Sequence, residues 1–136
     1  MTLHPESQRL LDELAELDLP PISRMTVVEA RQLLEAPVGP LHEVAEVCDD
    51  AFDGPAGTIR VRRYRPLVVG SEPVNLLVFF HGGGWVIGSI ESHEDTCRRL
   101  ANSCAAMVVS IDYRLAPESR FPAAVADCVA GLEWAS

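Results

Sequence analysis

Apolar positions in the first part of the chain recur at the spacing of amphipathic helices. We predict a helix over residues 5–18, with Pro5 in its first turn and Pro20 ending it. Its apolar face carries Leu10, Leu11, Leu14 and Leu17. Because no strand precedes this helix, we expect its apolar stripe to pack against something later in the chain.

A second helix is predicted to begin at Thr26 and to end before Pro37. The Thr26 hydroxyl and the Glu29 carboxylate have the spacing of a capping box, which satisfies backbone N–H groups at a helix start. Its apolar face holds Val27, Ala30, Leu33 and Leu34. We expect this stripe also to be buried against later elements.

The period then changes to that of strands. Residues 43–52 and 58–65 read as two strands around a turn-rich loop at 53–57, which predicts a hairpin. In the second strand Arg60 and Arg62 alternate with apolar residues. Arginines in a strand could contact RNA, but a half-exposed edge strand protected by charge is the favoured interpretation.

The rest of the chain alternates between buried strands and helices. Residues 66–73 read as a linker, and the run at 75–80 has no polar alternation, which is typical of a parallel strand covered on both faces. A glycine-rich loop, a helix over about 92–104, a strand over 106–111, a loop over 112–118 and a final helix from Phe121-Pro122 follow. This order predicts a mostly parallel α/β sheet.

Composition and charge narrow the function classes. The chain has 136 residues, 48% of them apolar, and a net charge of −9, so it is globular, and electrostatic binding to nucleic acid or to anionic membranes is not expected. All the acidic excess lies in residues 1–53. The start has no signal-peptide pattern and the longest apolar run is far too short for a membrane span. The four cysteines have no CxxC pair or zinc-site spacing, and Cys97 and Cys104 are too far apart in the predicted helix for a disulfide, so a cytoplasmic protein is expected.

The loop His81-Gly82-Gly83-Gly84-Trp85 directly follows a predicted buried strand. Consecutive glycines let backbone N–H groups approach a bound anion. A dinucleotide pyrophosphate is a weak candidate, because Ile87 stands where the third glycine of that fingerprint is required. The oxyanion of an acyl-transfer intermediate is the stronger candidate, since an HGGG-type loop forms this hole in lipases and esterases.

Two motifs in order then resemble a known family. The sequences at 81–85 and at 112–118 (Asp-Tyr-Arg-Leu-Ala-Pro-Glu), with Phe121-Pro122, are similar to the hormone-sensitive lipase family of α/β-hydrolases. The resemblance covers residues 44–136 closely. It implies an α/β-hydrolase fold with residues 1–40 as a helical cap segment and residues 41–136 as the first half of the hydrolase domain.

The resemblance also implies roles for individual residues. Gly83 and Gly84 would supply N–H groups to the oxyanion, and Gly82 would permit the turn. His81 would tie the loop down, and Trp85 would pack beside the substrate pocket or in the core.

The second motif would support this loop without doing chemistry. The family's pattern implies hydrogen bonds and an ion pair from Asp112, Tyr113, Arg114 and Glu118. The pair His93 and Asp95 has no third ligand at sensible spacing, so no metal site is expected. No cofactor is expected either.

None of the nine serines lies in a G-x-S-x-G elbow, and the other triad members have no candidate positions. We therefore expect an incomplete part of a serine-type carboxylic ester hydrolase, with a small-molecule ester as substrate of the complete protein and no activity of its own. Homo-oligomerisation stays open. The alternative is a non-catalytic ligand-binding module, or a decayed fragment, that needs a partner to complete its sheet. In the family's sheet order the strand at 75–80 would be left as an exposed apolar edge, which favours aggregation.

Overall fold

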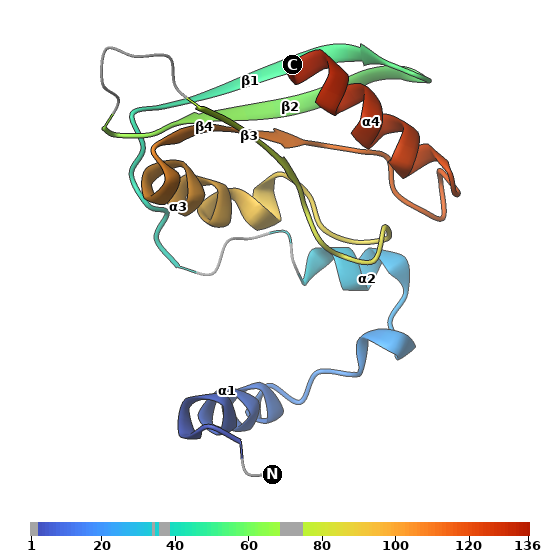
Figure 1. Cartoon of the computed structure of the whole chain (residues 1–136). Coiled ribbons are helices and arrows are strands. Elements are labelled where there is room, and N and C mark those ends of the chain that lie inside the picture. The colour runs from blue at the N-terminus through green and yellow to red at the C-terminus, as the bar shows by residue number, and fades with distance from the viewer. Residues whose placement is uncertain (1–2, 34, 36–38, 69–74) are drawn as a thin grey trace.

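The computed structural model describes residues 3–33, 35, 39–68 and 75–136, and its centre is a four-stranded sheet (Figure 1). Strands β1 (Glu46–Gly54) and β2 (Gly57–Arg65) form the predicted hairpin in antiparallel register, with Gly54 opposite Gly57. The turn is shorter than predicted, because both strands extend into the loop until only Pro55 and Ala56 remain between them.

The predicted β-α-β-α order is confirmed. Strand β3 (Asn75–Phe80), helix α3 (Glu94–Cys104), strand β4 (Ala106–Ile111) and helix α4 (Ala123–Ala135) follow one another, with a short 3-10 helix (Glu91–His93) leading into α3. β3 and β4 are parallel, and β4 pairs antiparallel with β2. The strand order is β1-β2-β4-β3.

Helices on opposite faces of the sheet give it two apolar layers. On the α3 face, Tyr64 and Val108 pack with Cys97 and Ala101 of the helix. On the α4 face a second cluster contains Phe52, Ile59, Val61, Val109 and Ile111. β3 contributes to both layers, as predicted, although its position at the sheet edge leaves Leu76 and Phe80 partly exposed.

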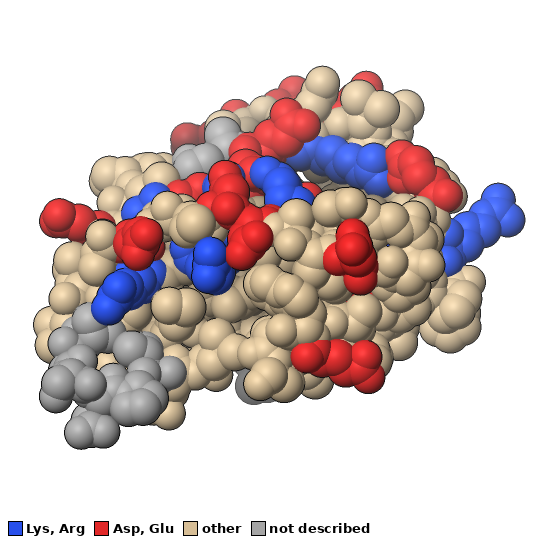
Figure 2. Space-filling view, turned by 90° about the horizontal axis from the view of Figure 1, so that it is seen from above, with Lys and Arg blue, Asp and Glu red and all other residues tan. Residues whose placement is uncertain are grey.

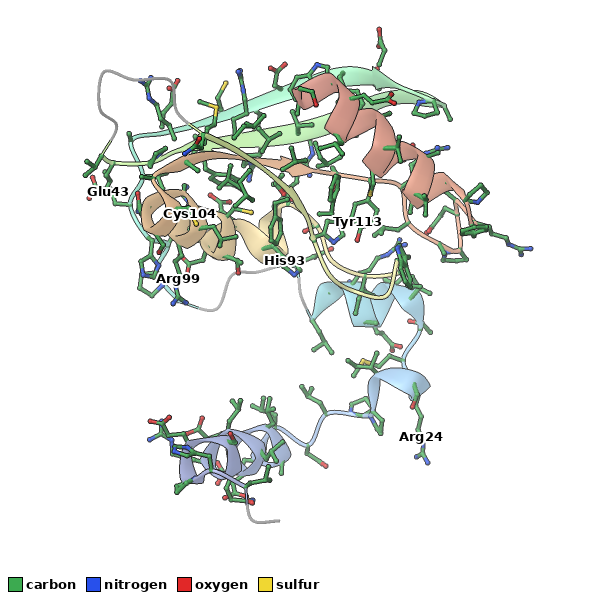
Figure 3. All side chains as sticks on the ribbon, viewed as in Figure 1. Arg24, Glu43, His93, Arg99, Cys104 and Tyr113 are labelled. Carbon is green, nitrogen blue, oxygen red and sulfur yellow. The ribbon has the colours of Figure 1, made fainter. Side chains whose placement is uncertain are left out.

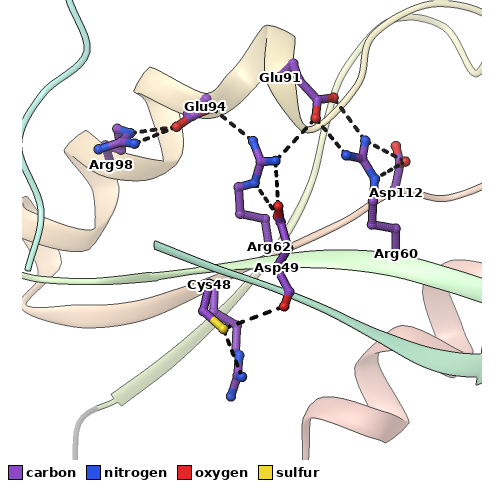
Figure 4. Close-up of polar contacts among 9 residues, drawn as sticks. Cys48, Asp49, Arg60, Arg62, Glu91, Glu94, Arg98 and Asp112 are labelled. Carbon is purple, nitrogen blue, oxygen red and sulfur yellow. Dashed lines mark hydrogen bonds and ion pairs between the residues drawn. The ribbon is translucent and has the colours of Figure 1, made fainter. Parts of the chain in front are cut away.

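The prediction that the strand at 58–65 is an edge strand is wrong, because β2 lies between β1 and β4. Its arginines are paired across the sheet rather than solvated at an edge (Figure 4). Arg62 contacts Asp49 of β1 at 2.5 Å and Glu94 of α3 at 3.0 Å, and Arg60 contacts Glu91 at 2.8 Å. The charge on this strand therefore ties β1, β2 and α3 together.

The helices at the start of the chain form where predicted, as α1 (Pro5–Glu16) and α2 (Val27–Gln32). The capping box is confirmed: the Thr26 N–H donates to Glu29 at 2.7 Å and the Glu29 N–H donates to the Thr26 hydroxyl at 3.3 Å. The predicted end of this helix at Pro37 and its apolar Leu34 lie outside the described residues, as does the linker segment 69–73.

The expected burial of the apolar stripes is wrong for α1 and largely wrong for α2. α1 has no buried residue, and it lies apart from the sheet (Figure 1). The four leucines of its apolar face stay about half exposed. In α2 only Ala30 is buried, so apolar packing does little to hold either helix against the sheet.

Charges are mixed over the face of the molecule seen in Figure 2, where arginines lie among carboxylates rather than in one basic patch. All four cysteines are free thiols. None of the helices in the described residues is long and apolar enough to cross a membrane.

Candidate active site

The two sequence motifs meet at one edge of the sheet. Phe80 ends β3 directly opposite Ile111, which ends β4. Because these strands are parallel, the residues that follow them, His81 and Asp112, leave the sheet side by side. Open α/β sheets bind their ligands at the carboxyl ends of such strands.

The glycine loop turns back on itself through left-handed backbone. Gly83, Gly84 and Trp85 have φ angles of 128°, 60° and 62°. The carbonyl of Gly83 accepts the N–H groups of Val86 at 3.2 Å and Ile87 at 3.0 Å. In the described part of the chain, the N–H groups of Gly83 and Gly84 donate to no other group, so both are available to an incoming acceptor.

Close packing of the backbone explains why glycine stands at positions 83 and 88. A Cβ on Gly83 would collide with the carbonyl of Ile87, and one on Gly88 would collide with the carbonyl of Gly82 and the ring of His81. A Cβ on Gly84 would meet nothing within 4 Å. Gly83 and Gly88 therefore keep the loop compact, whereas Gly84 needs glycine for its backbone angle alone.

His81 and Tyr113 tie this loop to the second motif. The Tyr113 hydroxyl donates to the His81 carbonyl at 2.5 Å, and the two rings stack with centroids 4.3 Å apart. His81 Nδ1 donates to the Gly82 carbonyl at 2.8 Å. Burial raises the pKa of Tyr113, so the phenol stays protonated and remains a donor at neutral pH. These bonds join the start of the glycine loop to the start of the second motif.

The side chains of Asp112 and Arg114 make their hydrogen bonds in the described residues away from the glycine loop. Asp112 accepts from Arg60 of β2 at 3.1 Å. Arg114 binds Asp127 of α4 through two guanidinium nitrogens, each at 2.7 Å, and Asp127 also accepts the Arg114 N–H at 3.0 Å. These residues anchor the second motif to the hairpin and to α4, so their support of the glycine loop is indirect.

Glu118 makes the ion pair with a residue that sequence reasoning missed. Its carboxylate binds Arg31 of α2 at 2.8 and 2.9 Å. This pair and a backbone hydrogen bond lower the pKa of Glu118 to about 2. The two residues are 87 positions apart, and nothing in the local pattern around Arg31 indicates a partner. Asp127 was missed as well, although a carboxylate among the apolar residues near the start of α4 is a sign of a buried pair.

Trp85 lines an apolar groove. The residue is 64% exposed, so it does not pack in the core. The groove has a volume of about 240 Å³ and is lined by Trp85, Phe121, Pro122 and Val125, with Ser119 and Ala124. It lies next to the glycine loop and can receive an apolar part of a ligand.

His93 lies beside Gly82, and Figure 3 shows it with Tyr113 between the strands and α2. Its Nδ1 is 2.9 Å from the Ser92 hydroxyl, and its ring centroid is 5.6 Å from that of His81. Burial, and then the neighbouring His81, lower the pKa of His93, which keeps the ring neutral. Asp95 instead contacts His42 at 2.8 Å. Within the described ranges, no group of three or more His, Cys, Asp or Glu could hold a metal ion.

Comparison with known proteins finds relatives of this chain. Residues 77–136 match a protein family described by the alpha/beta hydrolase fold. The carboxylic ester hydrolase LipN of Mycobacterium tuberculosis is 48% identical over 105 residues, which are 77% of this chain and 27% of LipN. The arylesterase of Saccharolobus solfataricus is 35% identical over 138 residues, covering 99% of this chain and 44% of the arylesterase. The chain thus spans less than half the length of these relatives.

Solved structures agree with the sequence relatives. An ester hydrolase from the metagenome of Lake Arreo superposes with a TM-score of 0.88 at 42% identity, covering 98% of this chain and 44% of that one. A hyperthermophilic esterase from Pyrobaculum calidifontis gives 0.85 at 39% identity, with 98% and 44% covered. Together with the two motifs and the sheet topology, these matches show that the chain belongs to the α/β-hydrolase family, in the branch related to hormone-sensitive lipase.

Proposed function

We propose that this chain is the oxyanion-loop part of a serine-type carboxylic ester hydrolase. The observation that supports it most directly is the pair of free N–H groups at Gly83 and Gly84, held in left-handed backbone at the carboxyl end of β3. Donors fixed in this way stabilise the negative oxygen that develops when an ester carbonyl is attacked, and removing one such donor costs about 100- to 1,000-fold in rate.

The remaining steps require an activated serine, for which the 136 residues contain no elbow motif. A serine activated by histidine would attack the carbonyl, form an acyl-enzyme and release the alcohol, and water would then release the acid. In this scheme the chain binds the oxyanion through Gly83 and Gly84, and His81 and Tyr113 hold the loop in position. The chain alone is inactive on this proposal, because none of its serines lies in an elbow.

The apolar groove supports a substrate with a modest apolar group. Trp85 and Val125 line a space beside the oxyanion donors that would accept a short or medium acyl chain or the alcohol part of an ester. The relatives are named as an arylesterase and as carboxylic ester hydrolases, which agrees with a neutral ester as the substrate class.

A chimera tests the proposal. Residues 1–136 would replace the aligned part of the Saccharolobus solfataricus arylesterase, whose remaining length would supply the other groups. We expect the chimera to hydrolyse p-nitrophenyl acetate and to react with a fluorophosphonate, and the isolated chain to do neither. The parent arylesterase is the positive control. A chimera that is folded by circular dichroism, retains the parent's serine and lacks turnover would contradict the proposal.

The second candidate is a non-catalytic module that binds a small apolar ligand in the groove. The exposed Trp85 favours this candidate. The two free N–H donors do not favour it, because a ligand-binding loop has no need of them. Saturable quenching of Trp85 fluorescence by an ester or acid, in a folded chimera that has no turnover, would favour this candidate.

A further inference from the structure

Arg31 of α2 connects the cap segment to both loops of the candidate site. Its Nε donates to the Val86 carbonyl at 2.9 Å, and its Nη2 donates to the Ala116 carbonyl at 3.0 Å. The same guanidinium binds the two carboxylate oxygens of Glu118 at 2.9 and 2.8 Å. Four hydrogen bonds from one side chain therefore join three segments that are far apart in the sequence.

Within the described residues, α2 has little other anchoring in this place. The helix has only six residues and buries only Ala30. A planar guanidinium that binds a carboxylate through two nitrogens has a fixed geometry as well as a charge, which a lysine lacks. The Arg31 side chain is 28% exposed, so its bonds to the two carbonyls are partly shielded from water. The contact between α2 and the site thus depends mainly on Arg31.

The bonds of Arg31 continue into the oxyanion loop. The carbonyl of Val86 accepts from Arg31, while the N–H of Val86 donates to the Gly83 carbonyl at 3.2 Å. The carbonyl of Ala116 accepts from Arg31, while the N–H of Ala116 donates to the Trp85 carbonyl at 2.8 Å. Each of these two residues is held at both its N–H and its carbonyl, so Arg31 restrains the turn that presents the Gly83 and Gly84 N–H groups.

We propose that Arg31 is a positioning residue of the oxyanion loop, which docks the cap segment on the site and holds the Gly83–Ile87 turn in its donor-presenting shape. Its value for catalysis rests on the proposed function. The coupling between α2 and the loop is a property of this chain and can be measured without any activity.

Hydrogen–deuterium exchange of the full chain tests the coupling. In Arg31→Met we expect the amides of Val86 and Ile87, which donate to the Gly83 carbonyl, to exchange about tenfold faster, because their loop loses the hydrogen bond from Arg31. The amides of α3 should keep their rates. Arg24→Met is the matched control, since Arg24 lies in the same segment, points away from the sheet in Figure 3 and makes no ion pair in the described residues. Arg31→Lys should give an intermediate rate, because one ammonium cannot make all four bonds.

A second measurement needs no destabilising variant. The Nε–H of Arg31 should give a resolved NMR resonance that exchanges slowly with water and that persists in Glu118→Gln, because its acceptor is the Val86 carbonyl. Equal exchange of the Val86 and Ile87 amides in Arg31→Met and in the unmodified chain, or an Arg31 Nε–H that exchanges as fast as that of Arg24, would overturn the proposal. Neither readout depends on ester hydrolysis, so an inactive chimera, together with a loop that Arg31 protects in the full chain, would reject the proposed function and keep the positioning role of Arg31.

Discussion

At the scale of single residues, Gly83 and Gly84 differ in what a methyl group would meet. A Cβ at Gly83 collides with the Ile87 carbonyl, so Gly83→Ala has to displace the loop. At Gly84 the space is open, and alanine has only the left-handed backbone to tolerate, which costs about 1–2 kcal/mol. In the arylesterase chimera we expect Gly83→Ala to lower kcat by about 100-fold or more, as loss of an oxyanion donor does. Gly84→Ala should lower it much less. Steady-state kinetics with p-nitrophenyl acetate measure both, and equal losses would contradict this distinction.

The main hydrogen bond of the Tyr113 hydroxyl is the one it donates to the His81 carbonyl. Tyr113→Phe keeps the stacked ring and removes that bond, leaving a buried carbonyl with one donor fewer. We expect a loss of about 1–2 kcal/mol in the free energy of unfolding of the chimera, read from urea denaturation. Because the carbonyl belongs to the first residue of the glycine loop, kcat should also fall. An unchanged unfolding midpoint would show that the hydroxyl does not hold the loop.

At the scale of elements, α4 is fixed to the second motif by one ion pair. Asp127 is fully buried and Arg114 is about one-third exposed. Arg114→Met leaves the carboxylate without its partner in an apolar layer, so we expect a loss of about 3 kcal/mol in the free energy of unfolding, the low end for a buried pair. Arg120→Met, which changes an exposed arginine without an ion pair in the described residues, serves as the control and should have little effect. Chemical denaturation of the two variants measures both changes in the free energy of unfolding.

The contribution of the Arg114–Asp127 pair to stability depends on pH, and the pKa of Asp127 sets the sign of that dependence. Burial alone raises the pKa of Asp127, but the hydrogen bonds and charge of Arg114 outweigh it and hold the pKa below its ordinary value of 3.8. A lowered native-state pKa stabilises the fold above the unfolded pKa, and that contribution is lost as the pH falls through the native pKa. The difference in stability between the unmodified chimera and Asp127→Asn should therefore be constant above about pH 5 and shrink below about pH 4. A difference that grows as the pH falls would contradict this assignment.

Elements whose signals are local could be predicted from the sequence. The capping box at Thr26 and the order of β3, α3, β4 and α4 depend on residues a few positions apart, and the structure confirms them. The predicted place of β2 at the sheet edge was wrong, because its second neighbour is β4, which lies far along the chain. Its arginines are neutralised by carboxylates that are also distant in the sequence. Likewise, the motif residues indicated the oxyanion loop, whereas Arg31 could be found only once folding brought α2 beside Glu118.

At the scale of the whole molecule, the sheet has two edges of different character. β1 pairs on one side only, but it carries carboxylates such as Asp49 and Asp50, which discourage pairing with another chain. β3 at the other edge has the sequence Asn75-Leu76-Leu77-Val78-Phe79-Phe80 and no charged residue. In an α/β sheet covered by helices, such a strand has the composition of an interior strand. In the described residues β3 pairs on one side only, so its outer edge offers unpaired backbone groups next to apolar side chains.

We expect the isolated chain to associate through this edge, with an apparent mass that rises with concentration in sedimentation velocity. Leu76 is 45% exposed, so Leu76→Lys adds a charge to the edge with little loss of packing and should shift the chain toward monomer. Val28→Lys is the matched control, because Val28 is an exposed apolar residue of α2, 64% accessible and away from the sheet edge. Equal association of both variants would show that apolar surface in general, including the exposed leucines of α1, drives self-association rather than strand pairing. In the chimera, where the arylesterase part adds its own strands, Leu76→Lys should instead destabilise the fold, since the position would then be interior.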